Sequence, residues 1–201
     1  MITVIDYDAG NIKSVEKALQ FLGEEVEVTR DPEKVRLADK LILPGVGAFG
    51  SAMDNLRTFS LEESIREAVK RGAPMLGICL GLQLLFPTSE ESPGAAGLSL
   101  LPGSIVRIPP AEGLKIPHMG WNSLRFPVKT RLFEGIPEES YVYFVHSFYL
   151  KTQDQPALAA TTEYGVTIGA AVEQDNLFAC QFHPEKSGRV GLRILKNFAE
   201  L

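Results

Sequence analysis

The stretch from residue 73 to residue 86 constrains the fold of this chain most, because it joins two apolar runs through a cysteine flanked by glycines. Residues 73–76 have the composition of a buried strand, and residues 84–86 continue an apolar helix. Gly77 and Gly81 lie two residues before and two after Cys79, as a sharp turn needs where backbone segments approach closely. A helix N-terminus favours a thiolate through its dipole and its unpaired N–H groups. The pattern therefore predicts Cys79 at the apex of a nucleophile elbow.

The first half of the chain alternates strand and helix signals. Ile12, Val15, Leu19 and Leu22 share one helix face, and Gly23 ends that helix. Ser60 and Glu63 have the spacing of a capping box for a second helix. Strands are expected at residues 2–5, 25–28, 40–43 and 73–76. Such units predict parallel strands covered by helices on both faces, with sites beyond the carboxyl ends of the strands.

The second half is rich in strand signals. Glycine and proline break the pattern between residues 87 and 121, and strands are then expected at residues 141–145, 157–161, 167–172 and 177–182, before a final helix. Because the sequence contains no repeat, low-complexity tract or linker, we predict one domain over residues 1–201. Its class is α/β, with a mostly parallel sheet flanked by helices and an antiparallel extension.

Composition narrows the functional classes. The 201 residues are 45% apolar with a formal net charge of −5 and no long basic run, so neither nucleic acid nor a membrane surface is an expected partner. Residues 1–5 are too short for a signal segment, and no apolar stretch reaches the roughly 18 residues of a membrane-spanning helix. We expect a cytoplasmic protein. Its two cysteines do not form a disulfide framework, and Cys180 is interpreted as core packing.

A cysteine nucleophile needs a base, and the sequence offers three histidines, His118, His146 and His183. His183 is the strongest candidate because it directly follows a predicted strand and period-2 geometry places Glu185 on the same side. The carboxylate could then orient the imidazole, as in a catalytic triad. An isolated cysteine or strand-end histidine is more often a structural residue, and only the combination favours catalysis.

Acyl chemistry also needs hydrogen-bond donors for the developing oxyanion. The elbow supplies the N–H of Leu80, and the loop containing Gly45, Val46 and Gly47 could supply another, although an ordinary tight turn would have the same sequence. The histidines and cysteines lack zinc-type spacing, and the chain contains neither a Walker loop nor a GxGxxG motif. We therefore predict neither a metal nor a cofactor.

These motifs together resemble the class I glutamine amidotransferases. The resemblance rests on residues 44–47, 77–83 and 183–185 in this order. It implies a flavodoxin-like fold in which Cys79 attacks the side-chain amide of L-glutamine, His183 transfers protons, and Glu185 orients His183. Water then releases glutamate, and ammonia passes to a synthase. Gly45 and Gln83 would help to hold the glutamine.

Further motifs are similar to those of the glutaminase subunits of imidazole glycerol phosphate synthases, namely residues 6–7, 10–11, 117–122, 143–147 and 183–187. This similarity implies a heterodimer with a (β/α)8-barrel cyclase, which uses the ammonia to make imidazole glycerol phosphate and aminoimidazole carboxamide ribotide in histidine biosynthesis. It places Glu91 at the substrate amino group. Asn11, Trp121, Asn122, Tyr143 and Lys186 match positions at the cyclase interface, although Trp121 and Tyr143 could equally be core aromatics.

Two residues depart from the family pattern. Asp8 stands where the family often has glycine, and Pro87 ends the helix after the elbow early, which affects how Glu91 is presented. The alternatives are a glutaminase subunit of pyridoxal 5'-phosphate or anthranilate synthase, a stand-alone cysteine hydrolase of glutamyl bonds, and a non-catalytic binding module of the same fold.

Overall fold

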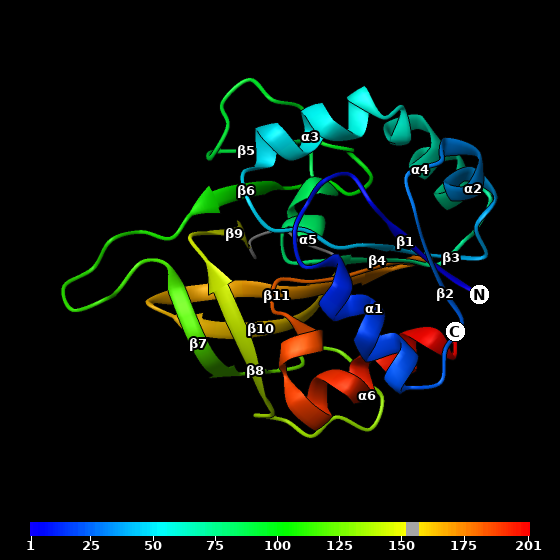
Figure 1. Cartoon of the computed structure of the whole chain (residues 1–201). Coiled ribbons are helices and arrows are strands. Elements are labelled where there is room, and N and C mark those ends of the chain that lie inside the picture. Colours follow the sequence, from blue (N-terminus) through cyan, green and yellow to red (C-terminus); the bar gives the residue numbers. More distant parts are fainter. Residues whose placement is uncertain (152–156) are drawn as a thin grey trace.

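A long mixed sheet runs through the computed structural model, which describes residues 1–151 and 157–201 (Figure 1). Its strand order is β2-β1-β3-β4-β12-β11-β9-β6-β5, and β10 pairs with β11. The strands of this sheet are β1 (Ile2–Ile5), β2 (Val26–Thr29), β3 (Lys40–Leu43), β4 (Met75–Ile78), β5 (Thr88–Ser89), β6 (Ser104–Arg107), β9 (Phe148–Lys151), β10 (Leu158–Tyr164), β11 (Val166–Gln174) and β12 (Leu177–Cys180).

The sheet has a parallel half and a largely antiparallel half. Strands β2, β1, β3, β4 and β12 are parallel neighbours in the order of a flavodoxin-like sheet. From β12 onward, β11, β9 and β6 pair antiparallel, and short β5 adds a parallel pair. The predicted fold class, with its antiparallel extension, is confirmed.

Helices cover both faces of the parallel half (Figure 1). Helices α2 to α5 lie on one face, and α1 and α6 lie on the other. Strand residues alternate between two cores because of the strand period: Leu41 and Leu43 enter the first, and Ile42 enters the second. The helices are α1 (Ile12–Phe21), α2 (Pro32–Leu37), α3 (Phe49–Thr58), α4 (Leu61–Lys70), α5 (Leu80–Leu84) and α6 (Gly188–Ala199), with a 3-10 turn η1 (Pro184–Lys186).

Three local expectations differ from the structure. Ser60 precedes α4, but its backbone is left-handed (φ +56°) and its side chain makes no capping hydrogen bond to the described residues, so the capping box is wrong. The stretch predicted as loops contains β6 and the start of β7 (His118–Ser123). Finally, β7 and β8 (Tyr141–His146) form a separate two-stranded sheet rather than extending the main one. The glycines and prolines around these short strands obscure their period.

The elbow between β4 and α5 depends on close backbone contact. Cys79 has a φ of +55°, in the region that L side chains rarely adopt. A Cβ on Gly81 would lie 1.8 Å from the carbonyl oxygen of Leu43, and one on Gly77 would lie 2.6 Å from that of Gly81. The two glycines are therefore required because the turn packs backbone against backbone.

In the described part of the chain, no helix is long and apolar enough to span a membrane.

Gly81→Ala should lower the free energy of unfolding by about 3 kcal/mol, because the new methyl group forces α5 away from the end of β3. Gly72→Ala is the matched control: Gly72 has a positive φ (+98°) with open space around the position of a Cβ, and should cost only about 1 kcal/mol. Urea unfolding measures both values. A loss for Gly81→Ala no larger than that for Gly72→Ala would contradict the contact with Leu43 as the reason for the glycine, because Gly81 lies in helix α5 and has no positive φ.

Candidate active site

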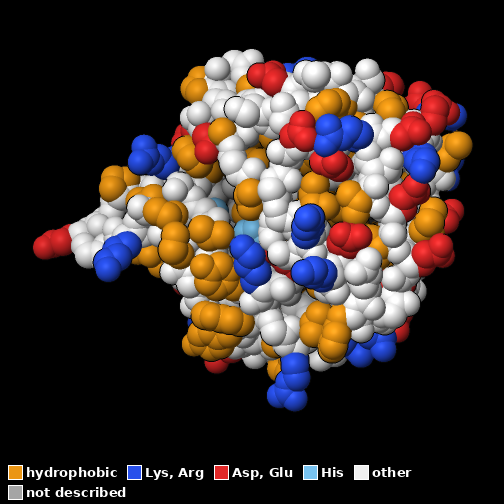
Figure 2. Space-filling view, in the orientation of Figure 1, with side chains coloured by type: hydrophobic (Ala, Val, Ile, Leu, Met, Phe, Trp, Pro, Cys, Tyr) orange, Lys and Arg blue, Asp and Glu red, His pale blue; other side chains and the backbone are white. Residues whose placement is uncertain are grey.

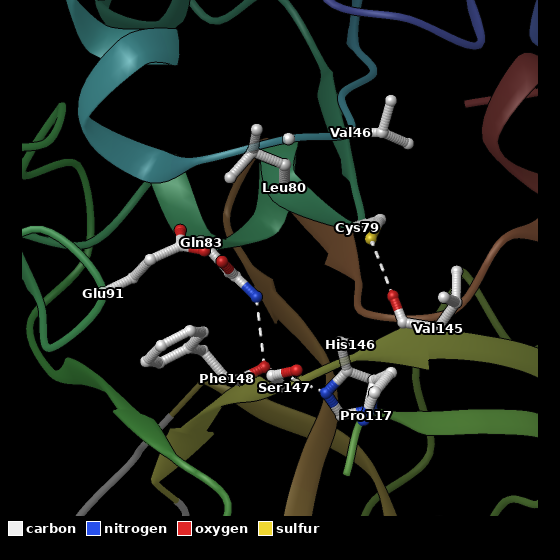
Figure 3. A pocket seen from close by; sticks show the side chains of 11 residues that line it. Val46, Cys79, Leu80, Gln83, Glu91, Pro117, Val145, His146, Ser147 and Phe148 are labelled. Carbon is white, nitrogen blue, oxygen red and sulfur yellow. Dashed lines mark hydrogen bonds between the residues drawn. The ribbon is translucent and has the colours of Figure 1, made fainter.

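The predicted site residues meet at the carboxyl edge of the parallel strands. The segments that follow β1, β3, β4 and β12 converge there, as expected for an open parallel sheet. A cavity of about 330 Å³ opens beside Cys79, at the lower end of the range for small-molecule sites (Figure 3). Its lining consists of Val46, Gly47, Cys79, Leu80, Gln83, Glu91, Pro117, Val145, His146, Ser147 and Phe148.

The Cys79 thiol is nearly buried between strand β8 of the small sheet and Gln181, which follows β12 of the main sheet. Its Sγ lies 3.9 Å from the carbonyl oxygen of Val145, to which the thiol donates (Figure 3). From the opposite side, Gln181 Nε2 donates to Sγ at 3.7 Å. The backbone N–H of Cys79 donates to the carbonyl of Cys180, which holds the elbow to the end of β12. The sulfur thus faces the cavity from a fixed backbone.

His183 and Glu185 form a buried pair. His183 Nδ1 donates to Glu185 Oε1 at 2.8 Å, and both side chains are fully buried. The pairing was predicted, but its geometric reason was wrong: β12 ends at Cys180, and the 3-10 turn Pro184–Lys186, rather than an extended strand, turns the carboxylate back. Among the described residues, His183 Nε2 and Glu185 Oε2 have no hydrogen-bond partner. Nε2 is therefore the atom available to a nucleophile or leaving group.

Charge near His183 controls its protonation. Burial lowers the pKa of His183, but interactions with Cys79 and Glu185 outweigh burial and raise the pKa to about 9. The coupling to Cys79 acts across a gap, since Nε2 makes no hydrogen bond of ordinary geometry with the sulfur. Such loose contacts between nucleophile and base are common in enzymes without substrate.

Two residues support this pair in ways the sequence did not reveal. Asn11, predicted only for the partner surface, donates from Nδ2 to Glu185 Oε1 and lies 3.4 Å from His183 Nδ1. Ser187 Oγ donates to the His183 carbonyl and accepts from the N–H of Tyr143. The His183 N–H in turn donates to the Tyr143 carbonyl. Strand β8 is thereby tied to the segment that carries His183 and Glu185.

The loop at residues 44–47 approaches the elbow with its oxygen and not with a donor. The Leu80 N–H, predicted for the oxyanion hole, donates to the Gly45 carbonyl at 3.3 Å. Val46 is exposed, and its side chain points away from the cavity, while Gly47 has a φ of +110° (Figure 3). Tyr7 Oη anchors the loop by donating to the Pro44 carbonyl at 2.6 Å. A Cβ on Gly45 would lie 2.2 Å from that hydroxyl, which explains the glycine.

Gln83 and Glu91 lie side by side in the cavity wall (Figure 3). Gln83 uses both amide hydrogens, one for the Phe148 carbonyl and one for Gln181 Oε1, each at 3.1 Å. Glu91 Oε2 accepts the N–H of Phe49 at the start of α3. The two side chains present acceptor oxygens to the cavity. Gly45, predicted to bind substrate, does not line the cavity and packs against Tyr7 and Leu80.

The other predicted partner residues lie on the β7–β8 hairpin or, for Lys186, on the turn η1. Trp121 and Tyr143 are register partners with ring centroids 6.1 Å apart, and Trp121 is 55% exposed. Lys186 is exposed on η1, whereas Asn122 is half-buried and donates to the Glu163 carbonyl. Hydrophobic side chains gather over β7 and β8 in the space-filling view, where Met119 and Tyr141 are also exposed (Figure 2).

Comparisons with known proteins identify the family of this chain. Residues 3–201 match the family model of the class I glutamine amidotransferases. The chain is 54% identical to the imidazole glycerol phosphate synthase subunit HisH of Moorella thermoacetica over its full length and 94% of that protein. It is 50% identical to the HisH subunit of Methanothermobacter thermautotrophicus, covering all of the chain and 98% of the relative.

Solved structures show the same fold at low identity. A glutamine amidotransferase crystal structure superposes with a TM-score of 0.77 at 22% identity, covering 100% of this chain and 98% of the other. PurLQS from Thermotoga maritima gives a TM-score of 0.75 at 21% identity, covering 99% and 97%. The chain belongs to the class I glutamine amidotransferase family and, within it, to the HisH subunits of imidazole glycerol phosphate synthase.

The free energy of unfolding should peak between mildly acidic and neutral pH. Burial lowers the pKa of His118 to about 4 and that of His146 to about 3, so below pH 6.5 the unfolded chain binds their protons first. Stability should then fall by about 1.4 kcal/mol per pH unit for each proton. His183, whose pKa is raised to about 9, contributes the opposite slope between pH 6.5 and 9.

Urea unfolding across this pH range checks both limbs. Relative to the unchanged chain, His118→Phe should show a shallower acid limb, and His183→Gln a shallower alkaline limb. If the variants kept the slopes of the unchanged chain, these histidines would not be the groups responsible.

Proposed function

We propose that this chain is the glutaminase component of imidazole glycerol phosphate synthase, and that it hydrolyses L-glutamine to glutamate and ammonia with Cys79, His183 and Glu185. The observation that carries the proposal is the buried His183–Glu185 pair at the same sheet edge as the Cys79 elbow, with an Nε2 that has no hydrogen-bond partner within residues 1–151 and 157–201. Residues 1–201 would act as one class I glutamine amidotransferase domain in the cytoplasm. The identity with HisH subunits supports the choice of synthase.

The proposed reaction forms and breaks one thioester. Cys79 gives its thiol proton to His183 Nε2, and the resulting thiolate attacks the side-chain carboxamide carbon of glutamine, whose carbonyl oxygen becomes an oxyanion. His183 Nε2 gives a proton to the departing nitrogen, which leaves as ammonia while the thioester remains. Water, deprotonated by His183, then attacks the thioester, and glutamate departs as the thiol is restored. Glu185 keeps the imidazole in orientation by accepting from Nδ1 and stabilises its charge, and Asn11 holds the Glu185 carboxylate by donating to Oε1.

The oxyanion hole in this proposal requires a change in the loop at residues 44–47. The Gly45 carbonyl accepts the hydrogen bond of the Leu80 N–H, which is a donor that the oxyanion of a tetrahedral intermediate would need. Turning the peptide between Gly45 and Val46 would replace this acceptor with the Val46 N–H and free the Leu80 N–H. Gly45 and Gly47 give the backbone the freedom to do so. Such a loop predicts low activity at rest and a population shift when the partner and its ligand bind.

The cavity suits the polar groups of glutamine. Glu91 would attract the α-ammonium group through its carboxylate, and Gln83 would accept a hydrogen bond through Oε1, because its amide hydrogens are already used. Pro87 stands at the end of the helical segment before Glu91, yet Glu91 still lines the cavity. Asp8 does not line the cavity; its carboxylate accepts a hydrogen bond from Arg30, which also donates to Asp6.

We propose a (β/α)8-barrel cyclase as the partner in a heterodimer, docking on the surface formed by Trp121, Tyr143, Asn122, Lys186 and the loop of Asn11. The exposed Trp121 on β7 and the half-buried Tyr143 beside it on β8 form the type of aromatic anchor found at the centre of protein interfaces. Ammonia would pass to this partner for synthesis of imidazole glycerol phosphate and aminoimidazole carboxamide ribotide in histidine biosynthesis. A glutaminase subunit of another synthase would share the triad but lack this aromatic anchor.

Cys79→Ala should abolish glutamate release in the complex with the cyclase subunit, while binding to the cyclase and synthesis from added ammonium persist. The matched control is Cys180→Ala, which removes a fully buried thiol whose pKa burial raises and which does not line the cavity. That variant should keep turnover and lose only stability. Retained turnover in Cys79→Ala would contradict the proposed nucleophile.

Trp121→Ala should weaken cyclase binding by at least about 2 kcal/mol, as loss of a buried aromatic anchor does. Phe21→Ala serves as the control, because Phe21 is 78% exposed at the end of α1, toward the opposite edge of the sheet. Isothermal titration calorimetry of each variant against the cyclase gives the affinities. Unchanged affinity for Trp121→Ala would contradict the assigned surface.

A further inference from the structure

Two buried histidines have no part in the proposed chemistry. His118 on β7 and His146 on β8 are register partners across the hairpin, only 2% and 6% exposed. The His118 ring stacks between Phe144 and Tyr164, with centroid distances of 4.7 and 3.9 Å. His118 Nδ1 lies 3.0 Å from His146 Nε2, so the rings share a hydrogen bond.

The partners at each end determine which nitrogens carry protons. His146 Nδ1 lies 2.9 Å from the Phe148 carbonyl, which can only accept, so Nδ1 must be protonated. Burial and the neighbouring His118 keep His146 neutral by lowering its pKa to about 3. Its Nε2 is then an acceptor, and His118 Nδ1 must donate to it. Neutral His118 consequently accepts at Nε2, 3.3 Å from the Asn122 amide nitrogen.

This series of hydrogen bonds ends at the Phe148 carbonyl oxygen, which also binds a side chain of the cavity wall. The Phe148 carbonyl accepts from His146 Nδ1 and from Gln83 Nε2 (Figure 3). Gln83 is linked onward to Gln181, whose amide reaches the Cys79 sulfur. One carbonyl thus joins the histidine pair to the side chain that faces the ligand.

We propose that His118 and His146 form a relay of hydrogen bonds with fixed tautomers, running from Asn122 to the Phe148 carbonyl, that positions Gln83 to bind glutamine. The inference rests on the proposed function. His118 is a positioning residue, because it lies outside the cavity lining and acts through His146. Loss of the His118 donor should leave His146 Nε2 unpaired, so that the tautomer and position of the His146 ring at the Phe148 carbonyl are no longer fixed and Gln83 can move. Glutamine binding should then suffer, while the chemistry of Cys79 and His183 proceeds.

Two substitutions at His118 separate hydrogen bonding from packing. His118→Phe keeps a ring between Phe144 and Tyr164 but cannot donate to His146. His118→Asn loses the stacked ring, while its Nδ2 takes the place of the Nδ1 donor. Steady-state glutaminase kinetics are measured in the complex with saturating cyclase and its nucleotide ligand. The affinity of each variant for the cyclase is determined separately.

The relay predicts that His118→Phe raises KM for glutamine about tenfold, the effect of one lost buried hydrogen bond, with kcat near that of the unchanged complex. His118→Asn should restore most of the KM despite a lower melting temperature. A role in packing alone predicts the reverse order. An unchanged KM in His118→Phe, or an equal rise in both variants, would overturn the proposal.

Tautomer states give a test that needs no turnover. Long-range proton–nitrogen correlation spectra of the chain with ¹⁵N-labelled histidine should show His118 and His146 protonated at Nδ1 near neutral pH. Protonation of either ring at Nε2 would overturn the relay. If the complex of the unsubstituted chain with the cyclase had no glutaminase activity, that result would refute the proposed function. The spectra would still decide whether the relay exists.

Discussion

The contact between Gly81 and the end of β3 is the constraint on which the site depends. With its Cα beneath the Leu43 carbonyl, Gly81 lets α5 begin against β3 and places Cys79 directly beside the loop at residues 44–47. A larger residue at position 81 would push Cys79 away from the loop at residues 44–47, which follows β3. The strained backbone of Cys79 persists because the N–H of the same residue is bonded to β12, the strand that leads to His183.

The antiparallel part of the chain completes this arrangement from the other side. Strand β8 contributes the Val145 carbonyl to the thiol, the Tyr143 carbonyl to His183, and His146 to the cavity wall. Trp121 and Tyr143, on the outer side of the same hairpin, form the proposed docking surface. Movement of strand β8 would therefore displace the contacts of both Cys79, the proposed nucleophile, and His183, the proposed base. This direct mechanical link is a physical route by which a docked partner can change activity.

Much of the fold and the site could be predicted from the sequence. The apolar periods and the glycines around Cys79 predicted the parallel half, and the spacing of His183 and Glu185 predicted their pairing. The separate β7–β8 sheet could not be predicted in this way, because its pairing depends on contacts between residues 118–123 and 141–146 that local composition does not encode. For the same reason the contacts of Asn11, Ser187 and the His118–His146 pair were not foreseen, since each joins segments far apart in sequence. The Gly45 carbonyl at Leu80 reflects a backbone orientation that glycine permits but does not specify.

We propose that the triad residues are in place at rest but that the Gly45 carbonyl blocks the Leu80 N–H until a cyclase binds. Glutamate release from L-glutamine by the purified chain, alone and then with an imidazole glycerol phosphate synthase cyclase subunit and its nucleotide ligand, tests this claim most directly. The account predicts little release by the chain alone and a large rise when both are added. High activity of the isolated chain would contradict the blocked site and indicate a free-standing glutaminase or hydrolase. Absence of activity under both conditions would contradict the choice of partner.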